Sequence, residues 1–228
     1  MTAQNPYSHK INPWSSHVRI ASLLDGLPAG TRVLDVGAAF GMLARSCAGR
    51  GYQLHAIEPN SHWMSENQGL YAGVFLGRLE QTPDSFLQGH AAVVCGDVLE
   101  HLVDPGEQLA RLVKLQPGGC IFIVSVPNVA NLWVRLSLLL GKFDYSDRGI
   151  LDRTHLHFYT RKSFSGLLRC AGLDITAMHA TPIPLELVSP FFTDNSLGKI
   201  IYRITAQFTS WLPSLLGYQF VAKARKVE

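Results

Sequence analysis

Short apolar segments alternate with helix-like segments from residue 31 onward, and this alternation is the feature that most constrains the fold. Several of the apolar segments, such as AAVVCG (91–96), are apolar throughout, which is typical of strands buried on both faces. Strands that alternate with helices form a mostly parallel sheet with helices on both faces. The chain of 228 residues therefore predicts one α/β domain. Strands are expected at 31–37, 52–58, 73–77, 91–96, 120–127, 173–180 and 217–226, and helices at 42–51, 105–116 and 161–172.

Two long segments interrupt this alternation, and residues 1–30 are expected to be a helical lead-in. The insertions span 128–160, after the fifth strand, and 181–216, after the sixth. Both begin at the carboxyl edge of the predicted sheet, where ligands bind in parallel sheets. We expect them to roof a pocket for the molecule acted upon. Their large apolar residues include Leu132, Trp133, Leu136, Leu138, Leu139, Leu140, Phe191, Phe192, Ile200, Ile204 and Trp211.

A helix is predicted inside the second insertion, with Asp194–Ser196 as its N-cap. Three interpretations fit its apolar stripe: packing on the domain, a lid over an apolar substrate, or contact with a membrane surface. The uncharged stretch 204–221 contains Pro213, Gly217 and several polar residues, so no membrane-spanning helix is expected. The stripe comprises Leu197, Ile200, Ile201, Ile204, Phe208, Trp211 and Leu212, with Lys199, Arg203 and Gln207 on another face.

Composition limits the partners and the compartment. The hydrophobic fraction of 47% predicts a packed core, and the net charge of +3 gives no concentrated basic face for nucleic acid. The N-terminus MTAQNPYSHK has no apolar signal core. Four separated cysteines beside apolar stretches, Cys47, Cys95, Cys120 and Cys170, are predicted to be buried free thiols. A reducing, cytoplasmic location is expected.

The segment VLDVGAAFG (33–41) ends a strand and opens a helix, which makes it a candidate ligand-binding turn. Its glycines, Gly37 and Gly41, are spaced GxxxG rather than the GxGxxG of dinucleotide sites. Asp35 before them suits a cationic aminoacyl group better than a pyrophosphate. Glu58 ends the next strand, where a carboxylate can accept hydrogen bonds from ribose hydroxyls. Together these residues predict a nucleoside ligand without phosphates.

With these motifs the chain resembles the class I S-adenosylmethionine-dependent methyltransferases over most of residues 30–180. VLDVGAAFG looks like their first motif, AIEPN (56–60) like the second and VVCGDVLEHL (93–102) like the fourth. LQPGGCIFIVSVPN (115–128) matches their helix, PGG turn and fifth strand. DRTHLHFYTRKSFSGLLRCAGL (152–173) resembles a bacterial subgroup close to the quinone-biosynthesis O-methyltransferases. The resemblance implies a Rossmann-like, seven-stranded sheet and S-adenosylmethionine as the cofactor.

The resemblance also assigns cofactor contacts, with two departures from the family pattern. Asp35 and Gly37 are expected at the methionine end, Glu58 at the ribose and Leu79 at the adenine. Ala39 stands where the family usually has its middle glycine, and Arg78 where an aspartate often meets the adenine amino group. The full set of expected cofactor residues is Asp35, Gly37, Ala39, Gly41, Glu58, Leu79 and Asp97.

The expected reaction is O-methylation of a small or lipid-linked acceptor, such as a glycan hydroxyl or a quinone-like ring. The stretch GDVLEH (96–101) lacks the Asn/Asp-Pro-Pro-aromatic motif of the family's amino-directed nucleic-acid enzymes. Two other functions stay open: N-methylation of small amines and cofactor binding without catalysis.

GDVLEH also places Asp97, Glu100 and His101 on one face, if a helix starts there. The pattern resembles the metal-binding segment of the quinone-biosynthesis O-methyltransferases and of the small-RNA 2′-hydroxyl methyltransferases. In HLHFYTR (155–161), His155 takes the position of a further histidine in the latter. The resemblance implies a divalent metal (Mg²⁺, Mn²⁺ or Zn²⁺) on Asp97, Glu100, His101 and His155.

Two interpretations without metal are also open at this segment. In one, His155 or His101 is a general base that removes the proton of the acceptor hydroxyl. In the other, Asp97 and Glu100 cap a helix and the histidines only pack. His157 would face away from His155 in an extended segment, so a structural role is expected for it.

Overall fold

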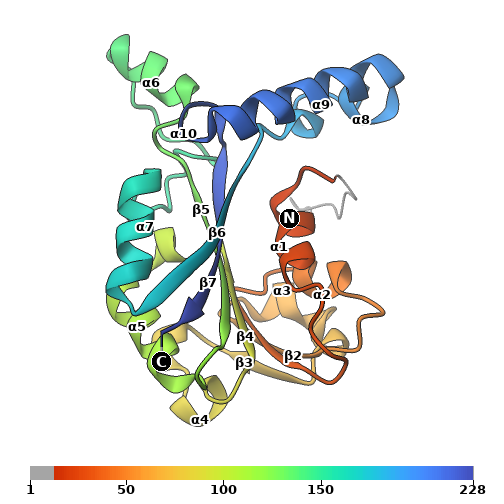
Figure 1. The fold of residues 1–228 in the computed structure, drawn as a ribbon, viewed down its shortest axis with the longest axis vertical. Coiled ribbons are helices and arrows are strands. Elements are labelled where there is room, and N and C mark those ends of the chain that lie inside the picture. Colours follow the sequence, from red (N-terminus) through yellow and green to blue (C-terminus); the bar gives the residue numbers. More distant parts are fainter. Residues whose placement is uncertain (1–12, 228) are drawn as a thin grey trace.

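The predicted strands form one seven-stranded sheet in the computed structural model, which describes residues 13–227 (Figure 1). The strand order is β3-β2-β1-β4-β5-β7-β6. The neighbouring pairs from β3 to β5 are parallel, and β7 is antiparallel to both β5 and β6. The predicted α/β sheet is therefore confirmed. The strands are β1 (Arg32–Val36), β2 (Gln53–Glu58), β3 (Gly73–Leu76), β4 (Ala92–Gly96), β5 (Ile121–Pro127), β6 (Leu173–Thr181) and β7 (Gln219–Lys226).

Helices cover both faces of the sheet, with α1, α2 and α3 on one face and α4, α5 and α7 on the other (Figure 1). Residues along each strand alternate between two buried clusters: Val33 belongs to the first layer and Leu34 to the second. Burying a large apolar side chain contributes roughly 1.5–3 kcal/mol, so these two layers hold the sheet in place. The helices are α1 (Ser16–Leu23), α2 (Met42–Ser46), α3 (Ser61–Ser65), α4 (Asp84–Leu87), α5 (Pro105–Leu115), α6 (Leu132–Leu139), α7 (Arg161–Cys170), α8 (Phe191–Asp194), α9 (Ser196–Trp211) and α10 (Pro213–Leu216).

The strand order reverses between β1 and β4. From β1 the chain runs outward to β2 and β3, and from β4 it runs in the opposite direction to β5. Ligands of open parallel sheets bind where the strand order reverses in this way. Both candidate segments, 37–41 and 97–101, directly follow these two strands.

The two insertions form α6 and α8–α10, which lie together at one end of the sheet (Figure 1). Their bases are joined by side-chain amides, because Asn131 Nδ2 donates to the Gly217 carbonyl at 2.9 Å and Asn128 Nδ2 donates to it at 2.9 Å. Both asparagines are buried, so the link between the insertions is shielded from water.

The helix α9 packs on the domain, as one interpretation expected, because it contacts β6, but its apolar stripe is exposed. The helix instead buries Gly198, Tyr202, Ala206 and Thr209. A cleft of about 500 Å³ lies along β6 and is lined by residues of α1, β6 and α9. None of the predicted catalytic or metal residues lines this cleft. The exposed stripe residues are Leu197, Ile200, Ile201, Ile204, Phe208, Trp211 and Leu212.

The helices agree with the expectation that no segment of the described chain is a membrane-spanning helix. Among residues 13–227, none of the helices has both the length and the apolar character needed to cross a bilayer. The predicted lead-in contains α1, and its residues 1–12 lie outside the described part of the chain.

The cysteines differ from the prediction at one position. Cys47, Cys95 and Cys120 are buried and free, but Cys170 is exposed at the end of α7. The helical pattern of 161–170 buries Phe164 and Leu168, and Cys170 lies off that buried face. Burial raises the pKa of both Cys95 and Cys120 to about 12, which keeps these thiols protonated.

We expect iodoacetamide to label Cys170 in the native protein and the other cysteines only after unfolding, because thiolates must be exposed to react. Mass spectrometry of labelled peptides checks this. A Cys170→Ser variant should show almost no native labelling. Rapid native labelling of Cys95 would contradict the buried position of β4.

Candidate functional site

The turn after β1 depends on two glycines with left-handed backbone angles. Gly37 has φ of 73° and Gly41 has φ of 69°. A Cβ atom on Gly37 would lie 2.5 Å from Cγ2 of Val98, and one on Gly41 would lie 3.3 Å from Cβ of Asn67. Only glycine allows this turn to lie so close to the segment that follows β4.

Glu58 fixes this turn from the end of β2. Its Oε2 accepts a hydrogen bond from the Ala39 backbone N–H at 2.8 Å, and its Oε1 accepts one from the Asn60 N–H at 2.8 Å. Ala39 has φ of 44°, in the left-handed region that favours glycine. Burial raises the pKa of Glu58, and the two backbone donors oppose that shift. The carboxylate therefore lies beside the glycine turn.

Asp35 is buried near the end of β1 and has one side-chain partner. The Tyr71 hydroxyl donates to Asp35 Oδ2 at 2.9 Å. Burial raises the pKa of Asp35 to about 7, against the lowering effect of this hydrogen bond. A cation placed beside Asp35 would favour the ionised carboxylate.

Leu79 and Arg78 lie in the 3₁₀ turn region after β3. The Leu79 side chain is buried in the core, and its carbonyl accepts a hydrogen bond from Arg111 at 3.2 Å. Arg78 is exposed and precedes the turn Leu79–Gln81. Leu79 thus presents mainly its backbone to any ligand at this edge.

Asp97 is held away from the other three predicted metal ligands. Its Oδ1 accepts from the Ser125 hydroxyl at 2.9 Å, and its Oδ2 accepts from Gln219 Nε2 at 2.7 Å. Its φ of 54° turns the chain sharply after β4. The segment then forms a 3₁₀ turn, Leu99–His101, instead of the start of an α-helix. The one-face arrangement that would bring Asp97 beside Glu100 and His101 is therefore absent from this segment.

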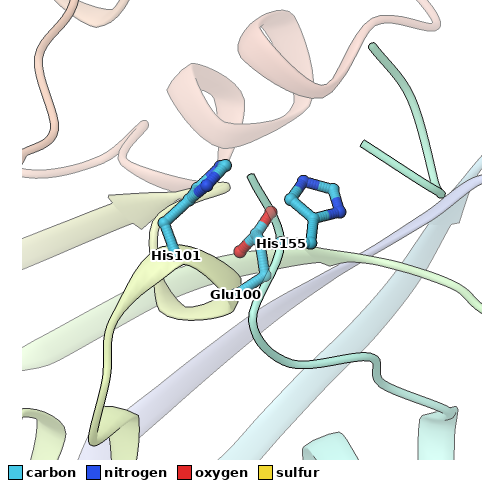
Figure 2. A group of neighbouring side chains, drawn as sticks. All are labelled: Glu100, His101 and His155. Carbon is cyan, nitrogen blue, oxygen red and sulfur yellow. The ribbon is translucent and has the colours of Figure 1, made fainter. Parts of the chain in front are cut away.

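Glu100, His101 and His155 come together at the carboxyl edge of the sheet. One potential ligand atom from each residue lies within 4.8 Å of the other two. Figure 2 shows the Glu100 carboxyl group between the two imidazole rings. The ring centroids of His101 and His155 are 4.8 Å apart. This spacing of one carboxylate and two imidazoles suits a divalent metal.

Glu100 has an environment unlike that of the other carboxylates here. Its side chain is 0% exposed, and among the described residues neither carboxyl oxygen has a hydrogen-bond partner. Burial, followed by the nearby Asp97, raises the pKa of Glu100 well above its usual value. A buried polar group without a partner is costly, by roughly 1–3 kcal/mol or more for a charged group. A cation between the carboxylate and the two imidazoles would remove this cost.

The two histidines are oriented by backbone carbonyls. His155 Nδ1 lies 3.1 Å from the Ile150 carbonyl oxygen, and His101 Nδ1 lies 3.3 Å from the Thr154 carbonyl oxygen. With Nδ1–H donating to a carbonyl, Nε2 keeps its lone pair, which is the arrangement usual for metal-binding histidines. Burial lowers the pKa of His155, followed in effect by His101, so the neutral ring is favoured.

Backbone hydrogen bonds join the segment that contains Glu100 to the segment that contains His155. The N–H groups of Leu156 and His157 both donate to the Glu100 carbonyl oxygen, at 2.8 and 3.2 Å. His157 lies outside the three-residue group, and its Nε2 pairs with the Val103 carbonyl at 3.2 Å. Segments that are 54 residues apart in the chain therefore lie side by side at the carboxyl edge of the sheet.

Sequence reasoning missed the residues that hold the carboxylates. Tyr71, Ser125 and Gln219 come from three separate elements, and no local motif links them to Asp35 or Asp97. Thr154, beside His155 in DRTHLHF, could have been found, because a Thr next to the predicted ligand offers both a hydroxyl and a carbonyl. Its hydroxyl lies 3.2 Å from His101 Nδ1.

The fold and the glycine turn define a class of protein, and comparison with known proteins confirms it. The family model of the methyltransferase domain matches residues 14–178. The chain belongs to this family and is an S-adenosylmethionine-dependent methyltransferase.

Similar proteins narrow the subgroup. The ubiquinone biosynthesis O-methyltransferase of Aeromonas salmonicida (strain A449) is 30% identical, over 77% of this chain and 76% of that protein. The enzyme of the same name from Xylella fastidiosa (strain 9a5c) is 29% identical, over 76% of this chain and 73% of its own. The resemblance to quinone-biosynthesis O-methyltransferases is therefore confirmed.

Solved structures share the fold at lower identity. Magnesium protoporphyrin IX methyltransferase from Synechocystis PCC 6803, with bound SAH, has a TM-score of 0.62 at 14% identity, covering 94% of this chain and 83% of that one. A SAM-dependent methyltransferase from Archaeoglobus fulgidus has a TM-score of 0.61 at 16% identity, covering 92% of both chains.

The raised pKa of Asp35 predicts a pH-dependent stability. The native state holds a proton on Asp35 up to a pH of about 7, whereas the unfolded chain releases it near 3.8. This contribution is complete below the unfolded pKa and is lost as the pH rises through about 7, with a slope of up to about 1.4 kcal/mol per pH unit. Asp97 and Glu100 also have raised pKa values and add to the measured slope, so we expect Asp35→Asn to reduce the slope in urea unfolding by up to about 1.4 kcal/mol per pH unit. Asp174→Asn, at an exposed aspartate, should keep the wild-type slope, and an Asp35→Asn slope equal to wild type would contradict the assignment.

Proposed function

We propose that this methyltransferase acts on a hydroxyl oxygen of a small or lipid-linked acceptor, with a divalent metal held by Glu100, His101 and His155. The observation that carries the proposal is the Glu100 carboxyl group, fully buried, without a hydrogen-bond partner among the described residues, and placed between two imidazoles. The relatives named as ubiquinone biosynthesis O-methyltransferases support an oxygen acceptor on a quinone-like ring.

The cofactor is proposed to lie over the turn between β1 and α2. Asp35 faces the cationic amino group of the methionine end, and the turn of Gly37, Ala39 and Gly41 allows a close approach of its backbone. Glu58 exchanges part of its hydrogen bonding from backbone N–H groups to the ribose hydroxyls. The Leu79 backbone borders the adenine, and Asp97, fixed by Ser125 and Gln219, borders the methyl-transfer region.

The three-residue group is chemically suited to a metal that activates a hydroxyl. When bound, a divalent cation lowers the pKa of a hydroxyl that coordinates it. Glu100 supplies the negative charge, and the carbonyls of Ile150 and Thr154 fix the two imidazoles with Nε2 available. The rest of the catalysis is alignment of the acceptor oxygen with the methyl group.

A metal-free route is the second candidate, and one observation favours it. His101 is exposed, while Glu100 and His155 are not, so an acceptor could reach its ring directly. A neutral imidazole there can act as the general base for a hydroxyl. The two routes differ in their dependence on metal and on Glu100.

We expect Glu58→Ala to weaken S-adenosylmethionine binding about tenfold or more, because charge-assisted hydrogen bonds contribute roughly 1.5–3 kcal/mol. Isothermal titration calorimetry measures the affinity. Glu66→Ala removes an exposed carboxylate at the end of α3 and serves as the matched control. Unchanged affinity in a folded Glu58→Ala protein would place the ribose elsewhere.

We expect the wild-type protein to bind one equivalent of Mn²⁺ or Zn²⁺ in equilibrium dialysis, and Glu100→Gln and His155→Ala to lose it. EDTA should abolish methyl transfer from labelled S-adenosylmethionine to a polyprenyl-substituted catechol, and added metal should restore it. His157→Ala is the control. The His157 ring pairs with the Val103 carbonyl and lies outside the three-residue group, so this variant should keep metal binding.

The outcomes separate the alternatives. Full turnover in EDTA together with an inactive His101→Ala or His155→Ala variant would establish the histidine base. Methylation of a primary amine in preference to the catechol would establish an N-methyltransferase. Cofactor binding without transfer to either acceptor would favour the non-catalytic function.

A further inference from the structure

A broad apolar surface lies exposed on the two insertions at the carboxyl end of the sheet. We call it the apolar platform: the outward faces of α6 and α9, with Trp133, Leu136 and Leu139 on α6 and Ile200, Ile204 and Phe208 on α9. Trp133 is 72% exposed, Leu139 81% and Ile200 55%. Exposed apolar surface of this extent, on helices of both insertions at one end of the molecule, indicates a contact with another apolar phase or molecule.

The platform is built into the fold. Buried Asn128 and Asn131 tie the start of α6 to the Gly217 carbonyl after α10, and α9 packs on β6 through its small and polar face. Figure 1 shows α6, α10, α9 and α8 in a row across one end of the molecule, with the C-terminus at the other end. The outward faces of both insertions are therefore presented together.

The charges of the platform are all of one sign. Segments 128–143 and 195–218 contain no aspartate or glutamate. They contain four cations, Arg135, Lys142, Lys199 and Arg203, and all four are exposed. The nearest acidic residues in the chain, Asp144 and Asp194, lie just outside these segments.

We propose that the apolar platform docks on the surface of an anionic phospholipid bilayer. Amphipathic helices with cations beside the apolar face lie in this way at the headgroup boundary, and tryptophan is enriched there. Each cation near such a surface contributes about 1 kcal/mol, which is about fivefold in binding. The helices of residues 13–227 are too short or too polar to cross the bilayer, so the proposed contact is peripheral.

Other occupants fit the charge pattern less well. A second copy paired platform to platform about a two-fold axis would bring like charges together, which opposes association. The twelve N-terminal residues, MTAQNPYSHKIN, carry too few large apolar side chains to cover two helices. An anionic bilayer complements both the apolar area and the cations.

Docking would bring the site to a lipid-linked acceptor. Glu100 follows β4, and His155 lies in the first insertion between α6 and α7, which is the insertion that carries part of the platform. An acceptor with its tail in the bilayer would therefore present its head group toward this end of the sheet. This consequence rests on the proposed function, but the docking itself does not, because it is measured without cofactor or acceptor.

The test is flotation of the full chain with two kinds of vesicle, phosphatidylcholine alone and phosphatidylcholine mixed with phosphatidylglycerol. We expect flotation with the mixed vesicles that weakens as salt is raised. Trp133→Ser combined with Ile204→Ser should reduce partitioning about tenfold or more. Lys199→Gln combined with Arg203→Gln should reduce it about fivefold per charge at low salt, and little at high salt.

Matched controls lie at the opposite end of the molecule. Val227→Ser removes an exposed apolar side chain, and Lys114→Gln combined with Arg225→Gln removes two exposed cations near the amino end of β5. These variants should float like wild type. All substituted side chains are exposed, and circular dichroism confirms that each variant is folded.

Three outcomes would overturn the proposal: no flotation of the wild-type chain with anionic vesicles, equal loss in the control variants, or a dimer in light scattering that the platform variants dissociate. Failure of methyl transfer would leave the flotation result unchanged, so the docking proposal and the proposed function can fail separately.

Discussion

Burial of the sheet on both faces is the constraint on which the rest of this structure depends. The central strands β1, β4 and β5 lie between two apolar layers, so polar side chains are almost excluded from their length. Charged groups can gather only where these strands end. Asp35, Asp97 and Glu100 lie within a few residues of the ends of β1 and β4, and Glu58 ends the neighbouring strand β2. The fold therefore concentrates four carboxyl groups at one edge, in a region of low dielectric constant where each needs a partner.

The structure supplies partners to three of these carboxyl groups. Asp35 has the Tyr71 hydroxyl, Glu58 has two backbone N–H groups, and Asp97 has Ser125 and Gln219. Glu100 has none among the described residues, and its neighbours are two oriented imidazoles. Three carboxyl groups thus accept hydrogen bonds from the protein, and Glu100 lies beside two imidazoles instead. This pattern is expected if Glu100 binds a ligand. The same contrast explains why Asp97 does not complete the metal group: its oxygens already accept hydrogen bonds from the protein.

The sequence predicted the sheet, its strands and the glycine turn, because these depend on local pattern. Continuous apolar runs reveal strands buried on both faces, and a glycine beside Val98 is required wherever the turn approaches that closely. It also predicted which histidine would join Glu100 and His101, through the resemblance of HLHFYTR. It could not predict the position of Asp97, since Gln219 is 122 residues away and the chain after β4 forms a 3₁₀ turn. Cys170 was placed wrongly because an apolar neighbourhood in sequence does not fix which side of a helix is buried.

The α9 helix shows the same limit most clearly, and it connects the two proposals. An apolar stripe at helical spacing shows that one face of a helix is apolar, but it does not show what that face contacts. Here the small face is the one that packs: α9 contacts β6, and a Cβ on Gly198 would lie 2.0 Å from the Phe191 carbonyl oxygen, so only glycine lets α8 and α9 meet. Tyr202 on that face donates to the buried Glu186 at 2.6 Å. The buried contacts of α9 are therefore made by small and hydrogen-bonded residues, and its apolar stripe is left exposed. A stripe that exposes Ile200 and Ile204 at the end of the sheet carrying the metal-type group supports the proposal that the acceptor reaches the site from a bilayer.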